Sequence, residues 1–186
     1  ILEELSFEQL NRHEDFFHHL IASDRNPKEV EKLMRDVKSG MPALLKDIAS
    51  SFIRSAKNEG QMPADLAIIQ KSRPVTPLFQ ICFEIYRSYQ ERLKLLGAVD
   101  FDDLIYHAWK CLKSDPDLVR HLAHRWPYIL EDEAQDSSKQ QQAILQVLAE
   151  QTGNWVRVGD TNQAIYQSFT TADPRLLKEY LARPDV

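Results

Sequence analysis

The stretch Tyr128-Ile129-Leu130-Glu131-Asp132-Glu133-Ala134-Gln135-Asp136 is a short apolar run that ends in acidic residues. A second run of the same kind, Trp155-Val156-Arg157-Val158, leads into Gly159-Asp160. Between the two runs we expect a helix that Ser137 caps and Gly153 ends. Strand, helix and strand joined by short connections form a βαβ unit, so the two strands are parallel. Their carboxyl ends, with the acids, therefore lie at the edge where open α/β sheets bind ligands.

The first half of the chain shows only helical patterns, and each predicted helix has a recognisable start. Ser6-Phe7-Glu8-Gln9 has the spacing of a capping box. Asn26-Pro27 predicts a helix that Gly40 stops, and Pro42 predicts the start of the next, with Gly60 after its end. The longest pattern runs from Thr76-Pro77 to Gly97.

Three further helices are predicted in the second half, starting at Asp100, Asp115-Pro116 and Asp173-Pro174. The chain is therefore predicted to be mostly α with an incomplete α/β part, and the junction between Gly97 and Asp100 is a candidate domain boundary.

The composition is typical of a globular protein and excludes several classes of protein. Of the 186 residues, 43% are hydrophobic and 27% are charged. We interpret Cys82 and Cys111 as reduced core thiols, which excludes a disulfide framework and a cysteine-based zinc site. No apolar run approaches the roughly 18 residues of a membrane span, and the acidic N-terminus is no signal peptide, so we expect a soluble, cytoplasmic protein with no membrane partner. The net charge of −5 gives no general attraction to nucleic acid.

The strand-end acids allow two interpretations. Acidic residues before a helix are favoured by the helix dipole alone, and that is the simpler one. The functional one is a magnesium–nucleotide site, because one strand-end carboxylate is enough to hold a hydrated Mg²⁺. A neighbouring carboxylate can then deprotonate the water that attacks a γ-phosphate. Asp132-Glu133 has this arrangement, and the second strand end brings Asp160 and Gln163 to the same edge.

Three ordered motifs make the functional interpretation specific. Ile129 to Asp136 resembles the D-E-x-Q-D motif of the UvrD/Rep family of superfamily 1 DNA helicases. Val158 to Tyr166 resembles that family's next motif, V-G-D-x-x-Q-S-I-Y. Val99 to Leu104 resembles its D-F-x-D-L segment, and Ile53 to Pro63, with Ala56-Lys57-Asn58, is more faintly similar. The resemblance implies a helical accessory subdomain over residues 1–98 and a partial RecA-like ATPase motor domain over residues 99–186.

The resemblance also implies roles in ATP chemistry. Asp132 is expected to bind Mg²⁺, the cofactor of the ATP substrate, largely through water, and Glu133 to be the general base. Gln163 is expected to sense the γ-phosphate. The residues that couple nucleotide and magnesium to the rest of the motor are expected to be Asp132, Gln135, Asp136, Asp160 and Gln163.

The same resemblance implies DNA as a partner, single-stranded and duplex, together with the remaining helicase domains. Tyr166 and Phe169 are expected where the family stacks single-stranded bases. The alternative for this pair is a place in the core beneath the second strand, because the register of Phe169 is displaced by one extra residue.

Departures from the family pattern limit the function that the resemblance implies for this chain. Glu131 stands where the family normally has an apolar residue, and Gln167 to Ala172 lacks the usual Arg-Gly pair. None of the five glycines is followed by lysine, so the phosphate-binding loop G-x-x-x-x-G-K-[ST] is not in this sequence. We therefore expect an internal fragment of an ATP-dependent, 3′ to 5′ DNA helicase that is inactive alone. The alternative is a non-catalytic, helicase-like protein-interaction module.

Overall fold

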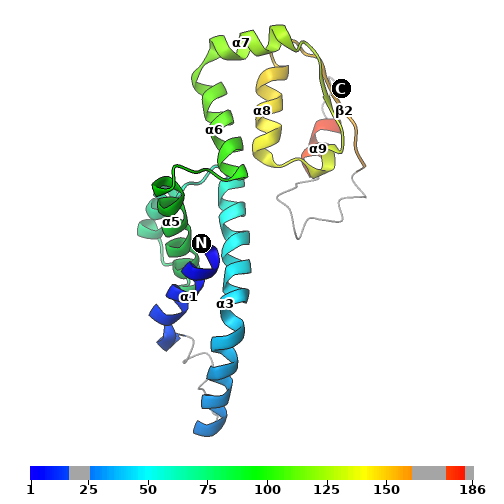
Figure 1. Ribbon diagram of the computed structural model, residues 1–186. Coiled ribbons are helices and arrows are strands. Elements are labelled where there is room, and N and C mark those ends of the chain that lie inside the picture. Colours follow the sequence, from blue (N-terminus) through cyan, green and yellow to red (C-terminus); the bar gives the residue numbers. More distant parts are fainter. Residues whose placement is uncertain (17–25, 161–174, 183–186) are drawn as a thin grey trace. The chain divides into compact units, whose positions relative to one another are not determined.

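The computed structural model describes residues 1–16, 26–160 and 175–182 (Figure 1). It consists of helices and one small parallel sheet, which confirms the predicted fold class, mostly α with an incomplete α/β part. Two compact units are present: residues 1–53 with 61–99, and residues 54–60 with 100–186. The predicted roles of residues 1–98 as an accessory subdomain and of 99–186 as a motor domain stay predictions.

In the described part of the first unit, all the regular secondary structure is helical. It contains α1 (Leu2–Arg12), most of α3 (Pro27–Asn58), α4 (Pro63–Ser72) and α5 (Pro77–Leu95). Both α1 and α4 pack on α5. The core is formed by large side chains that are almost fully buried, namely Leu5, Leu45, Ile81, Ile85 and Tyr86. Phe52 on α3 and Phe79 on α5 meet edge to face, with ring centroids 5.4 Å apart.

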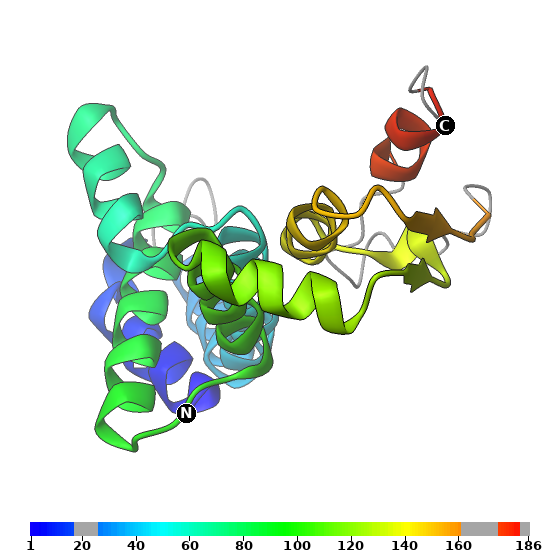
Figure 2. The ribbon, with the colours of Figure 1, turned by 90° about the horizontal axis from the view of Figure 1, so that it is seen from above.

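The second unit carries the sheet. Along the chain it contains the last turn of α3, α6 (Phe101–Ser114), α7 (Pro116–Arg125), β1 (Ile129–Glu131), the 3₁₀ turn η1 (Ala134–Asp136), α8 (Lys139–Ala149), β2 (Trp155–Arg157) and α9 (Arg175–Leu181). Both α6 and α7 pack on α8. The strands β1 and β2 lie side by side (Figure 2) and pair in parallel. Glu131 faces Arg157 in this register, so the predicted βαβ unit is confirmed.

Most of the predicted helix ends are correct. The side chains of Thr76, Asp100 and Asp115 each accept a hydrogen bond from the backbone N–H three residues later. Gly60, Gly97 and Gly153 adopt positive φ angles of 71°, 62° and 70°, the left-handed conformation that ends a helix. The cap of α8 is Ser138, one residue later than predicted.

Two predicted helix starts are wrong. The helix α1 begins at Leu2, so Ser6 lies buried inside it, because Glu3 and Glu4 already stabilise its first turn. Gly40 and Pro42 do not separate two helices, since both lie within α3. Gly40 has no positive φ. The apolar face continues past Pro42 at helical spacing, through the buried residues Leu45, Ala49, Ile53 and Ala56, and burial of that face outweighs the hydrogen bond lost at Pro42.

The two cysteines differ in environment. Cys82 is buried, as predicted, and its burial raises the pKa of the thiol to about 11. Cys111 is exposed on α6, so its assignment to the core is wrong. Helical spacing placed it near the apolar stripe but did not show that its position lies outside the packed face. In the described part of the chain, no helix combines the length and the apolar character needed to cross a bilayer.

Candidate active site

The loops that follow the two strands remain joined by backbone hydrogen bonds. Val158 N–H donates to Glu131 O at 2.8 Å, and Ala134 N–H donates to Val158 O at 2.9 Å. These bonds extend the pairing of β1 and β2 beyond the last residues of the strands. The loop that carries Asp132 and Glu133 is therefore fixed directly against the loop that carries Asp160.

Gln135 joins the same two loops through its side chain. Its amide oxygen accepts from Asp160 N–H at 3.0 Å, and its amide nitrogen donates to Glu133 Oε2 at 2.6 Å. Only 2% of Gln135 is exposed, so the amide that makes both hydrogen bonds is itself shielded from water. One buried amide thus connects the predicted general base to the predicted coupling residue Asp160.

Gly159 makes room for that amide. A Cβ atom at this position would lie 2.4 Å from Gln135 Oε1 and 3.0 Å from the backbone nitrogen of Ala134. The first separation is too short for non-bonded atoms and the second is tight, so a side chain here would displace Gln135. Glycine is required by close approach, since Gly159 has no positive φ.

Glu133 has a strained backbone. With φ 50° and ψ 43° it is the one non-glycine residue with positive φ among those that the structure describes. The left-handed conformation disfavours residues with a Cβ, and such strain gathers at functional sites. Glu133 N–H donates to Asp132 Oδ1 at 2.9 Å, which ties the two adjacent acids together.

The carboxylates at this edge are open to solvent. Asp132, Glu133, Asp136 and Asp160 are all exposed. In residues 1–16, 26–160 and 175–182, no three potential metal-ligating side chains form a cluster. The exposed carboxylate of Asp132 is the kind of oxygen donor that, with waters and substrate phosphates, holds Mg²⁺ in proteins. Gln163, Tyr166 and Phe169 lie outside the described residues, and their predicted roles stay predictions.

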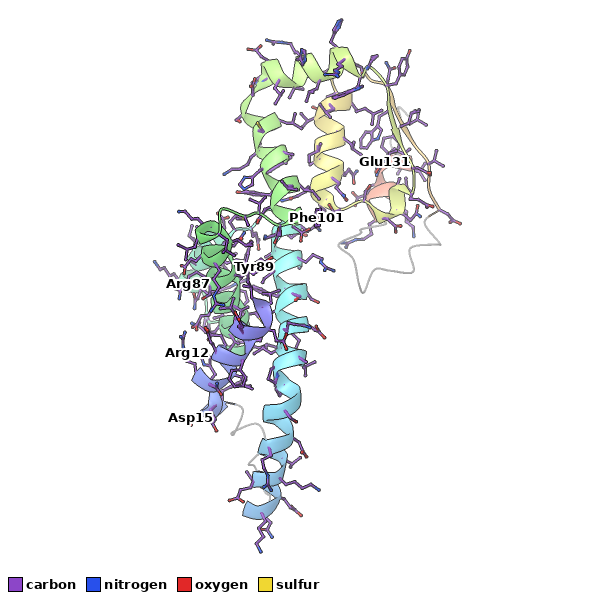
Figure 3. The ribbon with its side chains drawn as sticks, viewed as in Figure 1. Arg12, Asp15, Arg87, Tyr89, Phe101 and Glu131 are labelled. Atoms are coloured by element: carbon purple, nitrogen blue, oxygen red, sulfur yellow. The ribbon has the colours of Figure 1, made fainter. Side chains whose placement is uncertain are left out.

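A second cluster connects two of the motifs found in the sequence. Lys57 Nζ lies 2.6 Å from Asp100 Oδ2 and 2.7 Å from Asp103 Oδ1. The Lys57 side chain is fully buried, and that of Asp103 is 4% exposed. Asp100 and Asp103 also form the capping box of α6, which begins at Phe101, labelled in Figure 3. Lys57 of the Ala56-Lys57-Asn58 stretch therefore meets Asp100 and Asp103 within the second unit.

Asp102 is the neighbour of this ion cluster on α6. Burial, and next the adjacent carboxylate of Asp100, raise the pKa of Asp102 above its ordinary value of 3.8. The cations of Lys57 and Arg54 oppose this shift, while the carboxylate of Asp103 adds to it.

Sequence reasoning missed the partner of Glu131. Glu131, labelled in Figure 3, forms an ion pair with Arg157 on β2 at 2.6 Å. Glu131 departs from the family pattern, and the motifs alone do not identify the residue that neutralises its charge. Parallel pairing of equivalent strand ends was the signal that could have found Arg157, since each residue is the last of its strand.

The two strand ends thus bring adjacent acids, a bridging glutamine and a close-packed glycine together at one edge of a parallel sheet. Residues 3–183 match the family model "UvrD/REP helicase N-terminal domain", and the chain belongs to this family. The predicted family is confirmed.

Relatives with curated names support the same membership. The chain is 35% identical over 115 residues to "DNA helicase II" of Escherichia coli (strain K12), and 36% identical over 116 residues to "ATP-dependent DNA helicase PcrA" of Leuconostoc citreum. Each match covers 62% of this chain and 15% of the relative. "DNA helicase II" of Rickettsia typhi is 29% identical over 141 residues, which cover 75% of this chain and 20% of that protein. The chain thus spans a small part of the length of these relatives.

Proposed function

We propose that this chain is part of an ATP-dependent DNA helicase and supplies the acids that hydrolyse ATP. The bridge from Glu133 through Gln135 to Asp160 carries the proposal, because it holds the carboxylate of Glu133, the proposed general base, at a fixed place between two strand ends. Asp132 would hold Mg²⁺ together with the phosphates of ATP. Bound Mg²⁺ would neutralise charge on the phosphates, and Glu133 would take the proton of the attacking water.

The wider activity belongs to the same proposal. Loss of the γ-phosphate would be sensed at Gln163 and transmitted to Tyr166 and Phe169, which would stack single-stranded DNA. The whole protein would move 3′ to 5′, unwind duplex DNA in repair, replication restart or recombination, and act in the cytoplasm. This chain alone would not hydrolyse ATP, because none of its glycines is followed by the lysine of a phosphate loop.

The site is tested in the full-length polypeptide that contains this chain. Glu133→Gln keeps the shape of the side chain but removes the base, so ATP should still bind while kcat falls about 10² to 10⁴-fold. Asp132→Ala should also weaken magnesium-dependent ATP binding. Glu91→Gln, on an exposed position of α5, is the matched control and should leave kcat unchanged. Near-normal hydrolysis by both site variants would favour the non-catalytic interaction module instead.

DNA contact is tested separately from hydrolysis. Tyr166→Ala should weaken single-stranded DNA binding about 5- to 150-fold, since base–aromatic stacking contributes about 1–3 kcal/mol. Tyr128→Ala is the control, because Tyr128 is 70% exposed and precedes β1, at the opposite end of the strand from the acids. Loss of thermal stability with unchanged DNA affinity would place Tyr166 in the core.

A further inference from the structure

Glu131 and Arg157 form a buried, two-pronged ion pair across the sheet. Arg157 Nε donates to Glu131 Oε2 at 2.6 Å, and Arg157 Nη2 donates to Glu131 Oε1 at 3.2 Å. The exposed fractions of the two side chains are 0% for Arg157 and 6% for Glu131. The planar fork of arginine matches the two oxygens of a carboxylate, a geometry that the compact ammonium of lysine does not reproduce.

The remaining positions on the Glu131 carboxylate are also occupied. Ser137 Oγ donates to Oε1, and Trp155 Nε1 donates to Oε2 at 3.2 Å. Ser137 precedes the cap of α8, so this carboxylate, which β1 carries, contacts β2 and the residue just before that cap.

The guanidinium of Arg157 makes cation–π contacts with two aromatic rings. Its central carbon lies 4.7 Å from the ring centroid of Trp155 and 5.1 Å from that of Tyr180 on α9. Tyr180 also donates its hydroxyl to Trp155 O at 2.8 Å. Arg157 Nη1 has no hydrogen-bond acceptor in the described part of the chain. Glu131 is therefore the acceptor on which the buried cation depends.

An ion pair of this kind is not explained by stability alone. Desolvation of two charges offsets most of their attraction, and an apolar pair of similar volume is often equally stable. The pair favours the observed register of β1 and β2 over shifted registers. A slip of one residue would move Glu131 away from Arg157 and leave two buried charges without partners.

The position of the pair connects it with the acids. Glu131 directly precedes Asp132, and Arg157 is followed by Val158, Gly159 and Asp160. Resting on the proposed function of this edge, we propose that Glu131 and Arg157 are positioning residues. By fixing the register of β1 and β2, they hold Gln135 between Glu133 and Asp160 and so set the place of the general base.

The test uses hydrogen exchange at single amides in this chain. Arg157→Lys keeps the charge but removes the fork, so the N–H groups of Ala134 and Asp160 should exchange about tenfold faster. The N–H groups within α8 should change less than about twofold, because their partners lie inside the helix. Arg125→Lys on the exposed face of α7 is the matched control and should change neither set. Equal acceleration in α8 and at the strand ends would overturn the proposal, since it would show a general loss of stability.

The double variant Glu131→Val with Arg157→Met separates positioning from packing. We expect its melting temperature to stay within about 4 °C of the wild type, while Ala134 and Asp160 N–H groups remain fast to exchange. Full recovery of their protection would overturn the proposal, because apolar packing would then be enough to fix the register.

A kinetic experiment tests whether the strand register affects the proposed general base, Glu133. In the full-length polypeptide, Arg157→Lys should lower kcat about tenfold and leave KM for ATP within about twofold, because a shifted base affects the transition state more than binding. An unchanged kcat with lost strand-end protection would overturn the link to the acids. Failure of the proposed function is distinguishable, since it would appear as normal hydrolysis by Glu133→Gln and would leave the exchange results unaffected.

Discussion

Lys57 Nζ contacts Asp100 Oδ2 at 2.6 Å, although the two residues are 43 positions apart in the chain. The contact fixes residues 54–60 to the segment that starts α6, and both belong to the second compact unit. A fully buried ammonium between two carboxylates is a point where a single substitution has a large effect.

Replacing Lys57 by Met should destabilise the second unit by about 3–5 kcal/mol, because the Asp103 carboxylate would be left buried with its main cation gone. Urea unfolding followed by tryptophan fluorescence measures this unit, since Trp109, Trp126 and Trp155 all lie in it. Lys46→Met is the control. Lys46 makes only a 3.7 Å surface pair with Asp47, so the change should stay within about 1 kcal/mol. Equal effects of the two substitutions would contradict the importance of the buried cluster.

Asp102→Asn should raise the melting temperature at pH 7. The pKa of Asp102 is higher in the folded state than its unfolded value of 3.8, so the folded state binds this proton more tightly. Ionisation of Asp102 therefore destabilises the fold, fully above the folded pKa and not at all below 3.8. The advantage of Asn should shrink as the pH is lowered through that window.

Asp117→Asn provides the matched control for the pH series. Asp117 occupies the second position of α7, as Asp102 does in α6, but it is exposed. Both substitutions remove a charge from a helix N-terminus. Asp117→Asn also removes a surface ion pair with Arg120, which contributes little to stability, so the difference mainly reports burial. A constant difference between pH 7 and pH 4 would contradict the raised pKa.

Gly159→Ala should destabilise the chain by about 2 kcal/mol. The new methyl group would displace the Gln135 amide and break its hydrogen bonds to Asp160 and Glu133. Gly40→Ala is the opposite case, because nothing lies within 4 Å of the added atom inside α3. That change should stabilise by about 0.5–1 kcal/mol. Thermal unfolding followed by circular dichroism measures the change in stability for both substitutions. If both changes had the same direction, close approach would not be the reason for glycine at position 159.

Glu133→Gly should be more stable than Glu133→Ala by about 1 kcal/mol. Both variants lose the hydrogen bond from Gln135, so their difference reports the left-handed backbone alone. The same two substitutions at Glu91, inside α5, should give the reverse order by about 1 kcal/mol. If alanine were the better residue at both positions, the backbone at Glu133 would carry no strain.

The parts of the fold that follow from local patterns could be predicted. The βαβ unit follows from two apolar runs around one helix, and the caps at Thr76, Asp100 and Asp115 follow from short-range hydrogen bonding. The predicted helix starts at Ser6 and Pro42 are wrong because a local signal for a helix start is weaker than a continuous apolar face that extends past it.

The contacts that organise the site join residues distant in the chain. Gln135 and Asp160 are 25 positions apart, and Glu131 and Arg157 are 26 apart. The motifs placed the acids at one edge, but they did not show which side chain bridges the loops. The charge of Glu131 was visible in the sequence, whereas its neutralisation depends on the register of the strands, which appears only in three dimensions.

The pairing of Glu131 with Arg157 also bears on how this stretch of sequence can evolve. Loss of either residue alone would leave an unpaired charge in the interior, so drift through single substitutions is blocked and the two positions are expected to change together. Descendants of this chain would inherit both charges or neither. An acidic residue just before the paired acids thus predicts an arginine at the end of the next strand, two residues before the glycine, a correlation that genome sequences can reveal.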